Sequence, residues 1–102
     1  MMEREQSNII IIKATVKAMK EKLDENQWKK PIIEMELPQA LIRMKEEIGE
    51  LSEELSKPKL DYAAIRRELA DVVNFAGAAI NDCDRRLFKF TLWEGVEDTR
   101  EK

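Results

Sequence analysis

Residues 37–58 read LPQALIRMKEEIGELSEELSKP, and residues 61–80 read DYAAIRRELADVVNFAGAAI. In both segments apolar residues recur every three or four positions, which is the spacing of an amphipathic helix. Pro38 suits the first turn of the earlier helix, Pro58 ends it, and Asp61 is a suitable N-cap for the later one. Joined by a short turn, the two helices are expected to form an antiparallel hairpin.

Another helix is expected before the hairpin, starting near Ser7, a reasonable N-cap, and ending near Asn26. Its apolar residues again lie three or four apart, at Ile9, Ile12, Val16, Met19 and Leu23. Ile10 and Ile11 add apolar surface beside that stripe. We expect this helix to lie across the hairpin and to complete a helical bundle.

The remaining segments are a connector over residues 27–37 and a polar stretch from Lys89 on, where we expect a short helix or an ordered arm. The helix that begins at Asp61 can continue to about Phe88. The 102 residues include only three Gly and three Pro, which favours a few long elements in a single domain over residues 1–102. The sequence therefore predicts an all-α bundle of three main helices plus a short C-terminal helix or arm.

The first and third predicted helices carry more apolar surface than one small bundle can bury, which favours a dimer or a higher oligomer. The alternative is that these apolar residues are scattered over the surface of a monomer, which is common in soluble proteins. Gly77, Ala78 and Ala79 leave one stretch of the third helix narrow, so another helix could approach it closely.

Composition excludes several classes of protein. Hydrophobic residues make up 43% and charged residues 38%, which is too apolar for a disordered chain and too charged for a membrane protein. The formal net charge of −3 provides no basic excess for binding nucleic acid. The single Cys83 excludes an internal disulfide and suits a reducing compartment. We therefore expect a cytoplasmic protein with neither nucleic acid nor membrane as a partner.

The chain contains no histidine. This excludes Ser–His and Cys–His catalytic pairs, the HExxH zinc motif and the Glu-x-x-His pairs of di-iron bundles. Any metal must be held by oxygen ligands, which suit hard cations such as Mg²⁺, Mn²⁺ or Ca²⁺.

Carboxylates gather on the two predicted helices of the hairpin. Five of them share the face of the earlier helix opposite its apolar stripe: Glu46, Glu47, Glu50, Glu53 and Glu54. On the later helix Glu68 and Asp71 border the apolar stripe, where an unpaired carboxylate would lose favourable hydration. Both groups lie near the middle of antiparallel neighbours, so they could share divalent metal. An acidic face is also typical of any solvated amphipathic helix, so the earlier helix alone leaves both interpretations open.

The same residues form a paired motif. Glu46-Glu47-Ile48-Gly49-Glu50, then seventeen residues, then Glu68-Leu69-Ala70-Asp71 resembles the EExxE…ExxD signature of MazG-type all-α nucleoside triphosphate pyrophosphatases. The surrounding segments KEEIGELSEEL and RRELADVVNFAGAAI are similar to the two motif helices of that family. The resemblance covers roughly residues 37–80.

The resemblance implies a reaction, a metal and an assembly. The reaction is hydrolysis of an NTP or dNTP between the α- and β-phosphates to a monophosphate and pyrophosphate, which clears nucleotide pools and depends on Mg²⁺, with Mn²⁺ as a possible substitute. Members of the family form dimers or dimers of dimers. The implied metal ligands are Glu47, Glu50, Glu68 and Asp71. Glu46 is implied as an extra ligand or as the group that orients the attacking water.

Further residues are candidates for binding the nucleoside triphosphate substrate. Trp28 could stack on a base, although it could equally cap the end of the bundle. Lys29, Lys30 and Arg67 could contact phosphates, and Asn74 could hydrogen-bond the substrate or a ligand carboxylate. The alternative function is a non-catalytic helical oligomerisation or regulatory module. Storage of Ca²⁺ or Mn²⁺ is a third possibility, but the sequence has no EF-hand-like loop.

Overall fold

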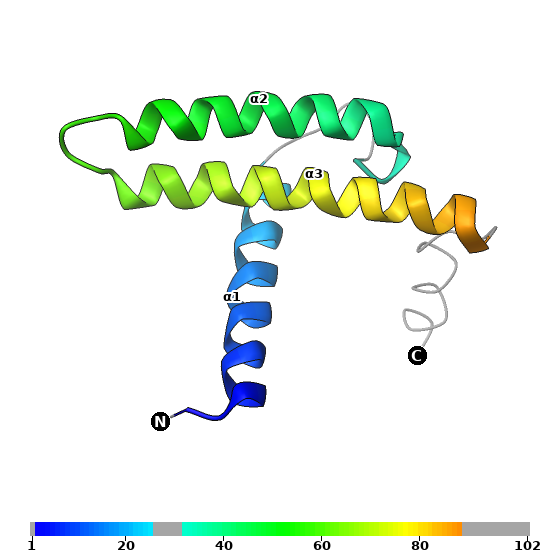
Figure 1. Ribbon diagram of the computed structural model, residues 1–102, viewed down its shortest axis with the longest axis horizontal. Helices are drawn as coiled ribbons and strands as arrows, with labels where there is room; N and C mark the ends of the chain where they lie inside the picture. Colours follow the sequence, from blue (N-terminus) through cyan, green and yellow to red (C-terminus); the bar gives the residue numbers. More distant parts are fainter. Residues whose placement is uncertain (1, 26–31, 89–102) are drawn as a thin grey trace.

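The computed structural model describes residues 2–25 and 32–88. It contains helices α1 (Arg4–Glu25), α2 (Leu37–Leu55) and α3 (Tyr62–Phe88), with a 3-10 helix, η1 (Ile32–Glu34), before α2 (Figure 1). No strand occurs in these ranges, so the predicted all-α class with three main helices is confirmed for them. The predicted C-terminal helix or arm from Lys89, and residues 27–31 of the predicted connector, lie outside the described residues.

Helices α2 and α3 run antiparallel and side by side, and the C-terminal end of α1 meets α3 near its middle, with α1 at a steep angle to the hairpin (Figure 1). Helix α1 packs against α3 through its C-terminal half, where Met19 and Leu23 are half-buried. Its N-terminal half projects away from the hairpin, and Ile11 there is 61% exposed. The first helix therefore lies across α3 as expected, but within the described residues it does not contact α2, and much of its apolar stripe is not covered.

The helix ends beside the turn of the hairpin form as predicted. The backbone N–H of Ala64 donates to Oδ1 of Asp61 (3.1 Å), which makes Asp61 the N-cap of α3. At the end of α2 the hydroxyl of Ser56 donates to the carbonyl of Glu53 (2.8 Å), and Pro58 follows in the turn. Local sequence is sufficient to place both ends.

The expectation that Ser7 caps the first helix is wrong, because α1 begins at Arg4. The backbone N–H of Ser7 donates to the carbonyl of Glu3 (3.0 Å), so Ser7 already belongs to the first turn. The backbone N–H of Glu3 donates to the side chain of Gln6 (3.3 Å), which is one half of a capping box. Residues 4–6 are good helix formers, so nothing delays the helix until Ser7.

The side of α2 that α3 covers carries glutamates. Its buried and half-buried residues follow one another at spacings of three and four: Leu37, Ala40, Met44, Glu47, Leu51 and Glu54. The predicted acidic face is therefore divided, because Glu47 and Glu54 lie in the seam between the helices and the other three glutamates are exposed. Conversely, Ile48 and Leu55 of the predicted apolar stripe are about half exposed. The two glutamates of the seam take positions that apolar residues usually fill.

Small residues let the helices approach closely at the middle of α3, as the sequence predicts. Ala40 of α2 packs with Ala78 and Ala79 in a buried cluster. Nearby, the terminal methyl of Met19 on α1 lies 3.7 Å from the point where a Cβ on Gly77 would stand. The narrow stretch of α3 therefore contacts both other helices.

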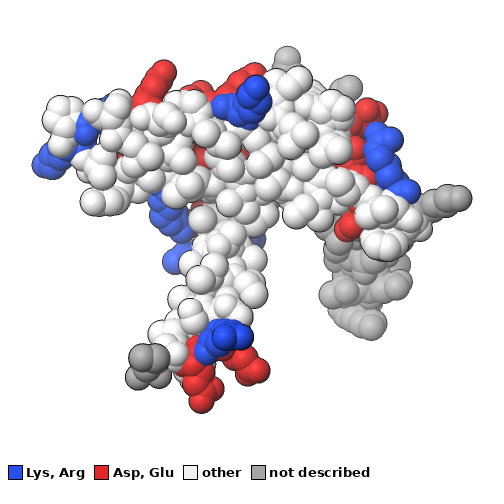
Figure 2. Space-filling view, in the orientation of Figure 1, with Lys and Arg blue, Asp and Glu red and all other residues white. Residues whose placement is uncertain are grey.

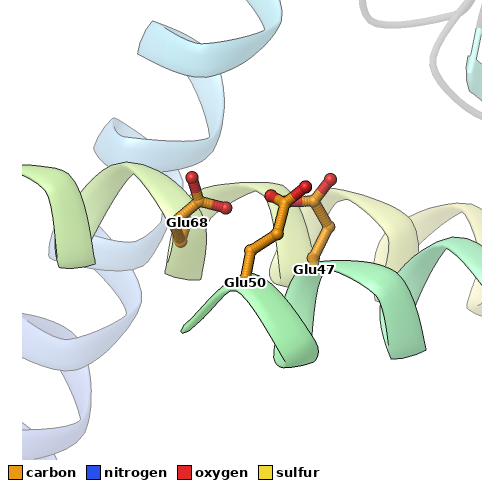
Figure 3. A group of neighbouring side chains, drawn as sticks. All are labelled: Glu47, Glu50 and Glu68. Carbon is orange, nitrogen blue, oxygen red and sulfur yellow. The ribbon is translucent and has the colours of Figure 1, made fainter. Parts of the chain in front are cut away.

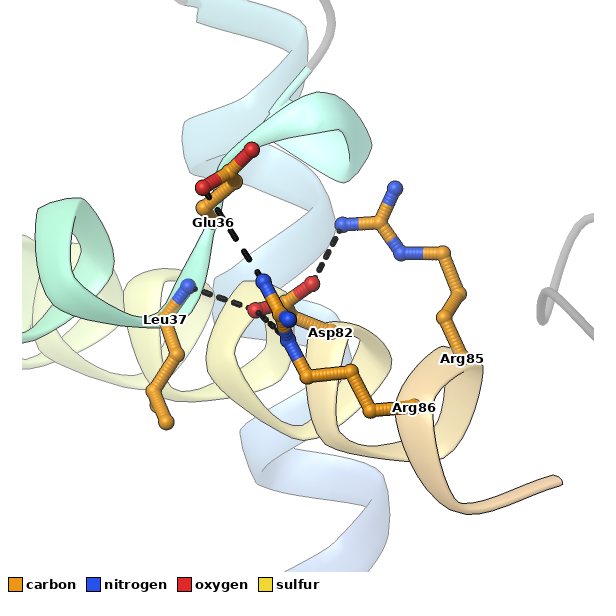
Figure 4. Close-up of polar contacts among 5 residues, drawn as sticks. All are labelled: Glu36, Leu37, Asp82, Arg85 and Arg86. Carbon is orange, nitrogen blue, oxygen red and sulfur yellow. Dashed lines mark hydrogen bonds and ion pairs between the residues drawn. The ribbon is translucent and has the colours of Figure 1, made fainter. Parts of the chain in front are cut away.

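The first turn of α2 is capped by a residue from α3. The backbone N–H of Leu37 donates to Oδ2 of Asp82 (2.8 Å), while Glu36, at the N-cap position itself, makes no side-chain cap (Figure 4). Arg85 and Arg86 also donate to the Asp82 carboxylate, at 2.8 and 3.1 Å. The hydrogen bond from Leu37 lowers the pKa of Asp82, and the hydrogen bond from Arg86 and the charges of both arginines lower it as well. This cluster fixes the start of α2 against the C-terminal part of α3.

We expect Asp82→Ala to lower the melting temperature by several degrees, because it leaves the Leu37 N–H and two guanidinium groups without their acceptor. Asp82→Asn should lower it less, because the amide oxygen can still accept from Leu37. Since the pKa of Asp82 is lowered, its contribution to stability is fully present above the ordinary aspartate pKa of 3.8 and is lost as the pH falls through the folded-state pKa. Circular dichroism melts measure this, with Asp84→Ala as the control. Equal melting of Asp82→Ala and Asp84→Ala would rule out the capping role.

Large apolar side chains remain exposed on α1 and α2. On the face shown in Figure 2, the projecting half of α1 carries few charged side chains apart from those near its N-terminal end. Each of these exposed residues is 48% to 61% accessible: Ile9, Ile10, Ile11, Ile12 and Val16 on α1, and Leu41, Ile42, Ile48 and Leu55 on α2. No helix within the described ranges is both long enough and apolar enough to cross a membrane.

Candidate metal centre

Three glutamates from two helices meet at the middle of the hairpin. Glu47 and Glu50 lie one turn apart on α2, and Glu68 lies opposite them on α3 (Figure 3). Each provides one carboxylate oxygen, and the three oxygens lie within 4.8 Å of one another. Glu47 and Glu68 are half-buried, whereas Glu50 is exposed. The group is therefore anchored in the seam between the helices and open to solvent on one side.

The glutamates of this group hold a proton when no cation is bound. The pKa of Glu47 is raised to about 8, first by burial, then by a hydrogen bond with Glu68 and by the charges of Asp71 and Glu50. Burial also raises the pKa of Glu68. Carboxyl groups this close cannot all ionise at little cost, so Glu47 and Glu68 share a proton near neutral pH. A divalent cation would remove that cost more completely than a proton does.

The ligand chemistry of the group fits a hard cation. No N–H or hydroxyl group of the described chain donates to the buried Oε2 atoms of Glu47 and Glu68. Buried oxygens without a partner are rare in folded proteins and call for an explanation such as an ion. Oxygen-only ligands from three carboxylates suit Mg²⁺ or Mn²⁺, which complete their coordination with water or phosphate oxygens.

Asp71, the fourth predicted ligand, is not one of the three carboxylates that meet. Its Oδ2 lies 3.5 Å from Nζ of Lys22 on α1, and the two side chains are only 13% and 14% exposed. Burial raises the pKa of Asp71, and the charge of Lys22 opposes that shift. Asp71 is still close enough for its charge to raise the pKa of Glu47. Lys22 thus places a positive charge at the edge of the candidate centre, and nothing in the sequence distinguishes it from the other lysines of α1.

Glu46, predicted as an extra ligand or a water-orienting group, points to a different partner. Its Oε2 lies 3.3 Å from Nη1 of Arg43 on the same helix, and both side chains are about half exposed. The Arg43 guanidinium in turn lies 5.9 Å from the centre of the buried Phe75 ring. Glu46 is therefore adjacent to the three glutamates in sequence but is not grouped with them.

The predicted substrate-binding residues have different outcomes. Asn74 is 5% exposed, and its side-chain amide donates to the backbone carbonyl of Met19 on α1 (3.2 Å). Its buried Oδ1 has no partner in the described part of the chain. Asn74 thus joins α1 to α3 through its nitrogen. Trp28, Lys29 and Lys30 lie outside the described residues.

No family model, no curated protein and no solved structure matches this chain. The assignment of a function therefore depends on the geometry of the three glutamates and on the paired motif that contains them.

Proposed function

We propose that this protein is a Mg²⁺-dependent nucleoside triphosphate pyrophosphohydrolase of the MazG type, which cleaves an NTP or dNTP to the monophosphate and pyrophosphate. The observation that supports this most strongly is the meeting of Glu47, Glu50 and Glu68 within 4.8 Å. These residues belong to both halves of the paired motif and come from both helices of the hairpin. Nucleotide pool clean-up is the role that this reaction would serve.

The chemistry requires a polyanionic substrate to be neutralised and a water to be activated. Bound at the three glutamates, Mg²⁺ or Mn²⁺ would supply both, by contacting phosphate oxygens and lowering the pKa of the nucleophilic water. Glu47 and Glu68 would anchor the cation from the seam, and they would give up their shared proton when it binds. Glu50, which is exposed, would hold the solvent-facing side where the substrate arrives. No covalent nucleophile is required, which agrees with a chain that has no histidine.

The proposal includes a dimer or a dimer of dimers. The exposed apolar residues on α1 and α2 support self-association, because a small chain gains stability by burying such surface. Sedimentation equilibrium of the purified chain at micromolar concentration should give a mass of two or four protomers. A monomer at all concentrations would exclude this part of the proposal.

The decisive experiment is a nucleotide panel with Mg²⁺, in which release of pyrophosphate and of orthophosphate is followed separately. We expect pyrophosphate and a monophosphate from at least one NTP or dNTP. The double variant Glu50→Gln plus Asp71→Asn should be inactive. The matched control is Glu53→Gln, since Glu53 lies one turn from Glu50 on the exposed side of α2 and outside the group. No release from any nucleotide, or full activity in the double variant, would overturn the proposal.

The second candidate function, a non-catalytic oligomerisation or regulatory module, is favoured by the same exposed apolar residues. Calorimetric titration with Mg²⁺ or Mn²⁺ separates the two candidates. A module should take up no metal specifically and should show no metal-dependent nucleotide binding.

A further inference from the structure

A cavity of about 340 Å³ adjoins the candidate metal centre, between the C-terminal part of α1 and the first turns of α3. Six residues line it: Lys22, Asp61, Ala63, Ala64, Arg67 and Glu68. Glu68 belongs both to this wall and to the group of three glutamates. A ligand held at the glutamates could therefore extend into this cavity without leaving the protein surface.

The polar lining of the cavity contains two cations, and each has a carboxylate partner that a ligand phosphate could replace. Nη2 of Arg67 lies 2.7 Å from Oε1 of Glu25, and both side chains are about half exposed. Exposed ion pairs contribute little free energy, so exchange of Glu25 for a phosphate has a small cost. Lys22 is paired with Asp71 at a longer distance, 3.5 Å. Arg67 and Lys22 thus supply a guanidinium fork and an ammonium, the two side-chain groups that bind phosphate most strongly.

The two carboxylates of the lining are engaged in other contacts. Asp61 accepts from the backbone N–H of Ala64 as the N-cap of α3. Glu68 is hydrogen-bonded with Glu47 and would face the metal. Ala63 and Ala64 complete the lining, and their side chains carry no charge. The cavity therefore suits an anion of several oxygens better than it suits a second cation.

We propose that this cavity is the subsite for the two outer phosphates of the substrate, with Arg67 and Lys22 as their binding residues. The inference rests on the proposed function and deepens it. With the scissile phosphate at the glutamates, the β- and γ-phosphates lie toward the two cations, which then hold the pyrophosphate that leaves. A larger cavity nearby, of about 550 Å³, also includes Arg67. Its lining holds three carboxylates and none of the three grouped glutamates, so it lacks the contact with the metal centre.

The chain provides a matched pair of arginines to test this subsite. Arg66 and Arg67 each lie 2.7 Å from a glutamate of α1, Glu21 and Glu25 respectively, and all four side chains are about half exposed. Replacing either arginine with glutamine removes one comparable ion pair between α1 and α3. Only Arg67 lines the cavity beside Glu68. If the arginines only stabilise the fold, the two substitutions should have equal effects on ligand binding. If the cavity is a phosphate subsite, the Arg67 substitution should have the larger effect.

The experiment is calorimetric titration of the full chain with inorganic pyrophosphate in Mg²⁺, together with steady-state kinetics on the best nucleotide of the panel. Arg67→Gln should weaken pyrophosphate binding about tenfold and raise KM by a similar factor, as expected for loss of one charge-assisted contact. Lys22→Gln should also weaken pyrophosphate binding. Arg66→Gln should change both quantities less than about twofold. Affinity for the nucleoside monophosphate, which lacks the outer phosphates, should be unchanged in Arg67→Gln.

The outcomes separate the subsite from the function on which it rests. Equal effects of Arg66→Gln and Arg67→Gln, or an equal loss of monophosphate affinity, would overturn the subsite while leaving the hydrolase proposal in place. The same holds if the wild-type protein hydrolyses nucleotides but does not bind pyrophosphate. If the wild-type protein takes up no Mg²⁺ and releases no pyrophosphate, both proposals fail together.

Discussion

Replacing Glu47 with glutamine is expected to abolish metal uptake and, at the same time, to stabilise the metal-free protein. Loss of an outer-shell partner costs about 10–100-fold in metal affinity, so loss of a ligand carboxylate should cost at least about 100-fold. Turnover that depends on the metal should fall at least as far. A residue with a merely structural role would not behave in this way, because its replacement destabilises the fold.

The gain in stability follows from the raised pKa of Glu47. In the folded protein this carboxyl keeps its proton up to about pH 8, whereas in the unfolded chain it loses the proton near 4.5. The free energy of unfolding of the wild type therefore falls as the pH rises from 4.5 to about 8 and is level above that. Glutamine does not titrate, so the free energy of unfolding of the Glu47→Gln protein should not show this decrease. The stability difference should grow through this window to about 1–3 kcal/mol, which is the full shift discounted for solvent access.

Urea unfolding in the presence of EDTA measures this difference at a series of pH values, and calorimetry measures Mg²⁺ affinity. Glu53→Gln is again the control, and the difference between its stability and that of the wild type should not change between pH 4.5 and about pH 8. A Glu47→Gln protein that is less stable than the wild type at pH 8, or that binds Mg²⁺ normally, would remove Glu47 from the proposed centre.

The second large effect is a steep dependence of metal affinity on pH. Near neutral pH the cation must displace the proton shared by Glu47 and Glu68. Release of one proton makes the apparent affinity rise about tenfold per pH unit. We therefore expect Mg²⁺ to bind about 100-fold more tightly at about pH 8 than at about pH 6, and to level off above the Glu47 pKa of about 8.

Calorimetric titrations at one pH in two buffers with different heats of ionisation count the protons directly, and about one per bound ion is expected near pH 7. Asp71 is not one of the three grouped carboxylates, so the fourth motif carboxylate should contribute little to that count. An affinity that does not change between these pH values would mean that the glutamates bind the cation without giving up a proton. That result would contradict the shared proton described for Glu47 and Glu68.

Much of the fold follows from local sequence. The capping by Asp61, the turn with Pro58 and the apolar spacing place both helices of the hairpin, and its antiparallel arrangement brings Glu50 and Glu68 together. The rotation of a helix about its own axis is different, because the partner decides it. Helix α3 covers the side of α2 that contains Glu47, which a spacing argument assigned to the solvent. The hydrophobic pattern alone does not specify which of two apolar sides is covered inside one chain and which stays exposed.

Residues that act across long sequence separations were the hardest to foresee. Lys22 contacts Asp71 because of the point along α3 at which α1 packs against it, and no sequence motif indicates that point. Asp82 likewise lacks any local signal for its contact with Leu37. Asn74 was predicted to hydrogen-bond the substrate or a ligand carboxylate, but its side-chain amide donates to the backbone of α1 and so joins two helices. The sequence therefore indicated most of the carboxylates of the candidate metal centre. It did not indicate the polar residues that join the helices to one another.

The cap that Asp82 provides for α2 has a consequence for biosynthesis. The acceptor lies 45 residues after the N–H that it serves, so the first turn of α2 is synthesised well before the residue that caps it. The tight turn around Pro58 is synthesised in between, and pairing of α2 with α3 can spread from it toward their distant ends. The contact between Leu37 and Asp82 is therefore expected to form last in the nascent hairpin. A chain that stops before Asp82 would leave the first turn of α2 without its cap.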